Sequence, residues 1–353
     1  MSTKYPAGVI TAVNPVTPSG PYQTSTASGI WTMEQAGYWI KQGLWPTAGN
    51  VKNFGPLYSW GRNSNGQLGL GNTTFYSNPK QVGSLTTWLN ISAGGYHTLA
   101  TKTDGTLWSW GFNFYGQLGL GNITNYSSPK QVGSLTTWSK ITAGGYHTIA
   151  TKTDGTLWSW GYNVFGQLGQ GNITNYSSPK QVGSLTTWLN IAGGYNFTLA
   201  TKTDGTLWSW GSNNYGQLGQ GNITKYSSPK QVGSLTTWSK ITAGGYHTIA
   251  TKTDGTLWSW GYNIYGQLGL GNTTKYSSPK QVGSLTTWLN ISAGFYHTIA
   301  TKTDGTLWSW GQNGFGQLGL GNTTNYSSPK QVGSLTTWSK ITAGFIHTIA
   351  TTI

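Results

Sequence analysis

The sequence predicts an all-β protein, a closed six-bladed β-propeller preceded by an N-terminal extended arm with a short helix. Three observations predict it. A unit of 50 residues fills 51–350 six times, each unit contains short strand patterns separated by turns, and the two ends of the array are complementary halves of one hairpin. A single unit cannot bury its own apolar side chains, so the units must stack against one another.

Two strings mark the repeat and keep their spacing throughout. Ser-Trp-Gly begins at 59, 109, 159, 209, 259 and 309, and Pro-Lys-Gln-Val-Gly-Ser-Leu-Thr-Thr-Trp begins at 79, 129, 179, 229, 279 and 329. A finer pattern alternates between units: Leu-Asn occupies 89–90, 189–190 and 289–290, and Ser-Lys occupies 139–140, 239–240 and 339–340. This alternation indicates that a pair of units was duplicated as a block.

Each unit is predicted to supply four short strands. Residues 97–103 alternate, and Asp104-Gly105 is a strong hairpin signal that leads into an aromatic strand at 106–110. A glycine-rich loop spans 111–122, and further strands are expected at 130–132 and 138–142. Four strands in a unit of this length are typical of a propeller blade.

The ends of the array predict how the ring closes. The first unit begins with only the second half of the hairpin, at 57–60, and the last unit ends with only the first half, at 347–353. We expect 347–353 to pair with 56–61, because this pairing closes the ring and removes both exposed sheet edges.

The run 141–150, followed by Asp154-Gly155 and 158–169, resembles the regulator-of-chromosome-condensation repeat, and the resemblance covers 51–353. It implies a propeller, although the family's best-known members have seven blades and six units are countable here. The family includes a guanine-nucleotide exchange factor that binds chromatin and a secreted inhibitor of β-lactamases, so it shares a fold and not one function. Thr101 and Thr151 replace the usual apolar residue, which predicts looser strand packing.

Residues 1–50 are predicted to form an arm for anchoring or oligomerisation. Residues 1–30 are rich in Ser, Thr, Pro and Gly and should be extended, while a capping pattern at Thr32 and Gln35 and a glycine at 43 predict a helix over 32–42. Its apolar side either packs on the propeller or docks onto a partner, and docking is favoured. The candidate anchoring residues are Trp31, Met33, Trp39, Ile40 and Trp45.

Part of the arm also suggests where the protein acts. Residues 28–36 with 41–46 resemble a short module of tailed-bacteriophage structural proteins. The resemblance implies a virion protein of the tail or capsid surface, attached to other virion proteins through residues 1–50. Homo-oligomerisation is expected.

The composition argues against an enzyme. The chain has six acidic residues and no cysteine, which excludes thiolate sites and most carboxylate chemistry. The aspartates at 104, 154, 204, 254 and 304 all precede glycine in turns, where we expect them to tolerate a positive φ. The histidines at 97, 147, 247, 297 and 347 share their position with Phe197, which indicates packing and not a metal site. No catalytic residue, metal or cofactor is predicted.

The net charge of +14 would attract polyanions, but the lysines are spread singly at fixed spacing. We therefore interpret them as solubilising and do not expect nucleic-acid binding. No segment is predicted to insert into a membrane.

The most informative positions are the few that vary between units. They lie in two loops per unit, and their substitutions are mostly Tyr, Phe and Asn, residues typical of binding loops. One interpretation is a ligand-binding face, and the other is that these residues fill the gaps between blades. The candidate ligand-binding residues are Arg62, Asn65, Tyr96, Phe112, Phe114, Tyr115, Tyr146, Tyr162, Phe165, Tyr195, Asn196, Asn214, Tyr215, Tyr246, Tyr262, Tyr265, Phe295, Tyr296, Gln312, Phe315 and Phe345.

These observations favour a non-enzymatic phage virion protein that displays the propeller to a host surface glycan or envelope protein. One alternative is a soluble protein-binding propeller that acts as a regulator or inhibitor. A second alternative is a capsid decoration protein that binds no receptor.

Overall fold

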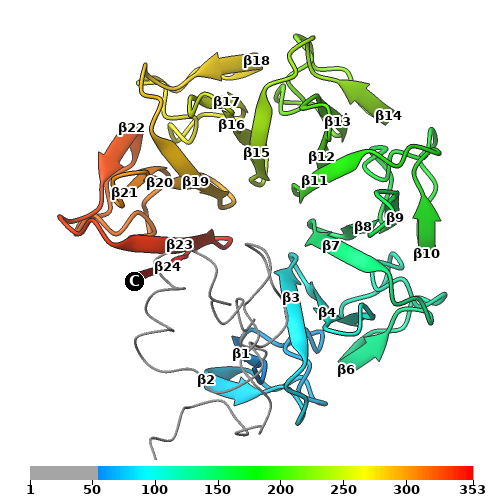
Figure 1. Cartoon of the computed structure of the whole chain (residues 1–353). Helices are drawn as coiled ribbons and strands as arrows, with labels where there is room; N and C mark the ends of the chain where they lie inside the picture. The colour runs from blue at the N-terminus through cyan, green and yellow to red at the C-terminus, as the bar shows by residue number, and fades with distance from the viewer. Residues whose placement is uncertain (1–54, 353) are drawn as a thin grey trace, which may run out of the picture. The chain divides into compact units, whose positions relative to one another are not determined.

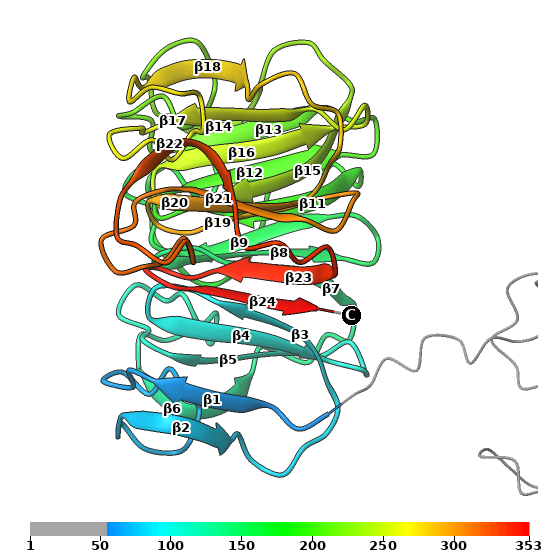
Figure 2. The same ribbon diagram turned by 90° about the vertical axis from the view of Figure 1, so that its left-hand side faces the viewer.

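The computed structural model describes residues 55–352, so the predicted helix 32–42 and the anchoring residues lie outside the described part. Every described element is a β-strand, and the strands are arranged as blades around a ring (Figure 1). Seen from the side, the strands run roughly parallel to the axis of the ring (Figure 2). The all-β class and the blade-like repeat are therefore confirmed.

Five sheets of four strands make up most of the ring. They are β3 (Trp88–Ala93), β4 (His97–Lys102), β5 (Leu107–Gly111) and β6 (Tyr126–Gln131); β7 (Trp138–Ala143), β8 (His147–Lys152), β9 (Leu157–Gly161) and β10 (Tyr176–Gln181); β11 (Trp188–Gly193), β12 (Phe197–Lys202), β13 (Leu207–Gly211) and β14 (Tyr226–Gln231); β15 (Trp238–Ala243), β16 (His247–Lys252), β17 (Leu257–Gly261) and β18 (Tyr276–Gln281); β19 (Trp288–Ala293), β20 (His297–Lys302), β21 (Leu307–Gly311) and β22 (Tyr326–Gln331). Two half-blades stand at the ends: β1 (Tyr58–Gly61) with β2 (Tyr76–Gln81), and β23 (Trp338–Ala343) with β24 (Thr348–Thr352).

The hairpin between the two middle strands forms where the sequence predicts it. The aspartate, however, stabilises the turn in a different way from the one predicted. Gly105 takes the positive φ of the turn, at +77°, and no described non-glycine residue has a positive φ. Asp104 instead accepts hydrogen bonds from the backbone nitrogen of Thr106 at 2.9 Å and from its hydroxyl at 2.6 Å. The prediction of a positive φ at the aspartates is wrong, and these carboxylates shape the turn by hydrogen bonding.

Two further expectations change. The outer strand predicted at 130–132 is β6, which begins earlier because Tyr126 pairs with Gly111 across an irregularity in the register. Thr101 is fully buried, and its hydroxyl accepts a hydrogen bond from the Asn90 side chain at 3.1 Å. The looser packing predicted at this threonine is not observed, since its polar atom is satisfied.

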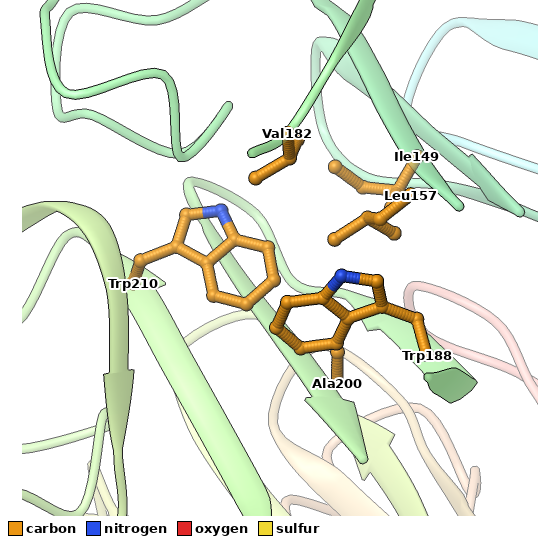
Figure 3. Close-up of a cluster of buried hydrophobic side chains, with 6 residues drawn as sticks. All are labelled: Ile149, Leu157, Val182, Trp188, Ala200 and Trp210. Atoms are coloured by element: carbon orange, nitrogen blue, oxygen red, sulfur yellow. The ribbon is translucent and has the colours of Figure 1, made fainter. Parts of the chain in front are cut away.

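The core lies between neighbouring blades. In one cluster, Ile149, Leu157 and Val182 belong to one blade and pack against side chains of the next (Figure 3). The next blade contributes Trp188, Ala200 and Trp210 to this cluster. An equivalent cluster recurs 100 residues later around Trp310. Because each cluster needs two units, the blades stabilise one another and not themselves.

Hydrogen bonds repeat the same pattern at each junction. The indole nitrogen of Trp160 donates to the carbonyl oxygen of Gln117 at 3.0 Å, and the Thr148 hydroxyl donates to the same oxygen at 2.8 Å. The last such indole bond runs from Trp310 to Gln267, at 2.9 Å.

The half-blades are neighbours around the ring (Figure 1), but β24 and β1 belong to separate sheets. Trp60 of β1 is 52% exposed, whereas its equivalent Trp310 is 0% exposed. On the other side lies a cavity of about 380 Å³, and its lining includes the five side chains equivalent to those of a core cluster that lacks its last tryptophan: Ile299, Leu307, Val332, Trp338 and Ala350. The predicted pairing of 347–353 with 56–61 is therefore absent from the described structure, although the two sides of such a junction are present at the ends of the ring.

Candidate functional site

Two loops of every unit lie at the same end of the strands. The first follows the innermost strand, at 94–96, and the second follows the third strand, at 112–115. Because β4 and β5 pair with His97 opposite Gly111, the two loops meet, and the backbone nitrogen of Phe112 donates to the carbonyl oxygen of Tyr96 at 3.0 Å. The variable positions of all units are therefore collected on one side of the ring.

The aromatic side chains at these positions form a continuous layer, which we call the aromatic face. Within it Tyr96 stacks on Tyr146 at 5.3 Å between ring centroids, and Tyr146 contacts Tyr195 at 5.7 Å. At the other end of the chain Phe295 stacks on Phe345 at 3.9 Å. The members are Tyr96, Phe112, Phe114, Tyr115, Tyr146, Tyr162, Phe165, Tyr195, Tyr215, Tyr246, Tyr262, Tyr265, Phe295, Tyr296 and Phe345.

Most of these rings are half-buried against one another, as the gap-filling interpretation of the variable loops expects, while the ligand-binding face stays a prediction. The rings fill space between neighbouring units, and they also leave apolar surface open to solvent. Phe114 and Phe345 are among the exposed large apolar side chains. The layer is therefore held in place by contacts between its own rings.

The remaining candidates lie in the same loops with fewer contacts. The Arg62 guanidinium sits 5.5 Å over the Tyr96 ring. Asn65 and Asn196 are half-buried, while Asn214 is exposed. Gln312 is half-buried, and Phe315 is exposed at the end of the array. The structure thus joins Arg62 to the aromatic face and leaves the other five candidates beside it.

Sequence reasoning missed two cations of this face. The Lys225 amine lies 4.9 Å from the Phe165 ring centroid. The Lys275 amine lies 5.0 Å from that of Tyr215. Their column varies between units, and this variation is the signal that could have identified them: Phe75, Asn125, Asn175, Lys225, Lys275 and Asn325.

The aromatic face has a basic rim. Its cations are Arg62, Lys225 and Lys275, while every described aspartate lies in a hairpin at the other end of the strands. Burial raises the pKa of Tyr296 to about 12 and shifts the pKa of Tyr146 and Tyr246 upward as well. These phenols stay protonated at neutral pH and can donate hydrogen bonds to a ligand.

The histidines stand below this face and hold the blades together. The Nε2 atom of His147 lies 3.0 Å from the Thr198 hydroxyl of the next unit. Burial lowers the pKa of His147 to about 3, so the ring is neutral. Within residues 55–352 no cluster of His, Cys, Asp or Glu side chains could hold a metal ion. In the same part of the chain, no helix has the length and apolar character needed to cross a membrane.

Comparison with known families and structures identifies relatives of the fold. The RCC1-like domain family matches residues 47–289, and the regulator of chromosome condensation (RCC1) repeat matches 304–351 and, in a second form, 288–317. No match is found among curated protein sequences.

Three solved structures share the propeller fold at low sequence identity. Human WBSCR16 has a TM-score of 0.75 and 23% identity over 85% of this chain and 81% of its own. Prp20p from Saccharomyces cerevisiae, described with its binding properties to Gsp1p and histones, has a TM-score of 0.77 and 23% identity over 86% of this chain and 81% of its own. Yeast RCC1 (Prp20) bound to Kap60 gives 0.75 and 22% identity over 86% and 79%.

Proposed function

The chain belongs to the RCC1-like domain family, and from this premise we propose that it is a non-catalytic binding protein whose aromatic face holds a protein partner. The continuous aromatic layer carries the proposal. The units are nearly identical along their strands and differ mainly in the loops that build this layer. A surface that varies on a constant frame is suited to recognition.

The chemistry of the layer favours a protein partner. Tyrosine and arginine contribute disproportionately to binding energy at protein interfaces. Rings that are already packed against one another lose little conformational entropy on binding. The cations at the rim, Arg62, Lys225 and Lys275, favour an acidic surface on the partner. The solved relatives support this class, since Gsp1p and histones, described with Prp20p, and Kap60, bound to yeast RCC1, are proteins.

The test compares two pairs of exposed apolar residues. Phe114→Ser/Phe315→Ser removes rings that are 61% and 71% exposed at the aromatic loops, and Leu185→Ser/Leu235→Ser removes side chains that are 47% and 46% exposed in loops at the other end of the strands. A partner recovered from the source cells by crosslinking is purified and titrated against each variant by calorimetry. We expect the phenylalanine variant to bind about tenfold more weakly or worse and the leucine variant to bind as the parent does. Equal affinities of the two variants would contradict the proposal.

A virion role is a second candidate. It is supported by residues 28–46, which resemble phage attachment modules, and by Asn65, Asn196 and Asn214, whose amides beside aromatic rings suit a sugar. In that role residues 1–50 contact other virion proteins, and the aromatic face binds a host glycan or envelope protein. A glycan array probed with the same two variants separates the candidates, because glycan binding lost only in the phenylalanine variant favours the virion role.

We further infer that the two half-blades join into a sixth blade. The junction between consecutive units recurs through the chain, and its two sides remain at the ends: Trp60 on one, and the cavity around Leu307 and Trp338 on the other. Insertion of Trp60 would complete a core cluster of the kind in Figure 3. It would also remove a large exposed aromatic surface from water.

A further inference from the structure

A cavity of about 730 Å³ lies on the axis of the ring, between the innermost strands of the blades. The alternating pattern of the sequence faces it, since Leu-Asn and Ser-Lys fall on the strands that line it. The polar side chains on its wall are Asn90, Lys140, Asn190, Lys240, Asn290 and Lys340. The pattern thus places lysine and asparagine in turn around one axis.

The lysines connect neighbouring strands but keep hydrogen-bonding capacity. The Lys140 amine donates to the Asn190 side-chain oxygen and to the Leu189 carbonyl oxygen, both at 2.7 Å. The Lys240 amine repeats this with Asn290 at 2.9 Å and Leu289 at 2.6 Å. An ammonium group has three donors, so each of these lysines retains one N–H for a ligand.

The charge of these lysines is not balanced by the wall of the cavity. None of its lining residues is acidic. The described acidic residues on this side of the ring are the hairpin aspartates, and Asp104 accepts hydrogen bonds from Thr106 and is influenced by the charge of Lys102. Ile141 and Ile241 lie beside the lysines, and apolar walls strengthen the field of nearby charges.

The site is separate from the aromatic face. Lys140 is the third residue of β7, whereas Tyr146 follows the end of that strand. The lysines therefore stand toward the mouth of the channel opposite the aromatic loops. A ligand bound here would leave the aromatic face free.

We propose that Lys140, Lys240 and Lys340 form an axial binding site for a small polyanion that carries several phosphate groups. Three cations around one axis match a compact ligand of high negative charge, and a lysine amine binds phosphate as a point charge with rotatable donors. The inference does not rest on the proposed partner of the aromatic face.

The experiment is calorimetric titration of the full chain with inorganic tripolyphosphate at low salt. Lys140→Gln/Lys240→Gln/Lys340→Gln removes the three charges and leaves a neutral side chain with N–H donors at each position. The matched control, Lys130→Gln/Lys230→Gln/Lys330→Gln, removes the same charge from the outer strands β6, β14 and β22. We expect one saturable site in the parent and control chains and about tenfold weaker binding or worse in the axial variant.

Equal loss in both triple variants, or no saturable binding to the parent chain, would overturn the proposal, since diffuse surface charge would then explain the data. If the axial variant does not fold, Lys340→Gln replaces it. The Lys340 amine makes no hydrogen bond to the described residues, so this change removes charge without breaking a junction. Unchanged affinity in that variant would also refute the site.

Discussion

At the scale of single residues, the buried histidines show that one position of the repeat accepts either a polar or an apolar ring. His147 contacts the Thr198 hydroxyl of the next unit, and burial lowers its pKa to about 3. Phe197 occupies the equivalent position in another unit and is equally buried. A neutral imidazole and a phenyl ring both fill the space between blades, which is why this column tolerates either.

These histidines predict a loss of stability in mild acid. In the unfolded chain a histidine takes up a proton near its ordinary pKa of 6.5, whereas native His97, His147 and His247 do so only near 3. Their contribution to the free energy of unfolding is full above pH 6.5 and is lost as the pH falls toward 3, by about 1.4 kcal/mol for each unit of difference and each histidine. Urea unfolding between pH 7.5 and 4.5 should show this decline.

The control for this prediction uses the replacement that the chain itself contains. His147→Phe/His247→Phe should have a shallower decline over the same pH range. Hydrogen bonds lower the pKa of the hairpin aspartates below 3.8, so their contribution to the free energy of unfolding changes only below the pH range of this experiment. An unchanged slope in the double variant would show that the histidines do not set the acid sensitivity.

At the scale of elements, a single hairpin turn controls how one unit meets the next. Gly155 has a φ of +77°, and a Cβ at this position would collide with the carbonyl oxygen of Thr186. Gly183 has a similar φ of +60° but faces open space. An alanine at Gly183 would therefore meet only an unfavourable backbone conformation, whereas an alanine at Gly155 would also meet a steric clash.

Gly155→Ala should destabilise the protein much more than Gly183→Ala. Gly183→Ala costs about 1–2 kcal/mol of stability, because an alanine is held in a left-handed conformation. Gly155→Ala adds a clash with the backbone of Thr186, which requires the turn to move away from the segment that leads into β11. Urea unfolding of both variants at neutral pH measures the difference. Equal destabilisation would mean that the hairpin does not contact the next strand as described.

The elements also show what the sequence could predict. The strands containing His97 and Trp110 were predictable because alternation and the Asp-Gly turn are local signals. The start of β6 at Tyr126 was not, because its polar pattern has no alternation and its pairing passes through an irregular register. The loop columns of the aromatic face were visible as variation between units. Lys225 and Lys275 were missed, because their contacts with rings of neighbouring loops are long-range.

At the scale of the whole molecule, both proposed sites depend on the ring. The aromatic face collects loops from successive units, and the axial cavity is lined by strands from β3 to β23. The alternation of asparagine and lysine was visible in the sequence, but only the ring places Lys140, Lys240 and Lys340 around one axis. In a closed ring of six units Lys340 would be followed by Asn90, which keeps the alternation unbroken.

Both sites therefore depend on closure of the ring, which an introduced disulfide can test. Leu99 pairs with Ser109 between β4 and β5, so the same register places position 349 opposite position 59. The chain has no cysteine, which makes an introduced pair unambiguous. We would oxidise Ser59→Cys/Ile349→Cys, with Ile349→Cys alone as control, and measure free thiols, light scattering and mobility on non-reducing gels. We expect a monomer with one internal disulfide, because paired strands bring the two sulfurs within bonding distance. Free thiols, or disulfide-linked dimers, would contradict closure of the ring within one chain.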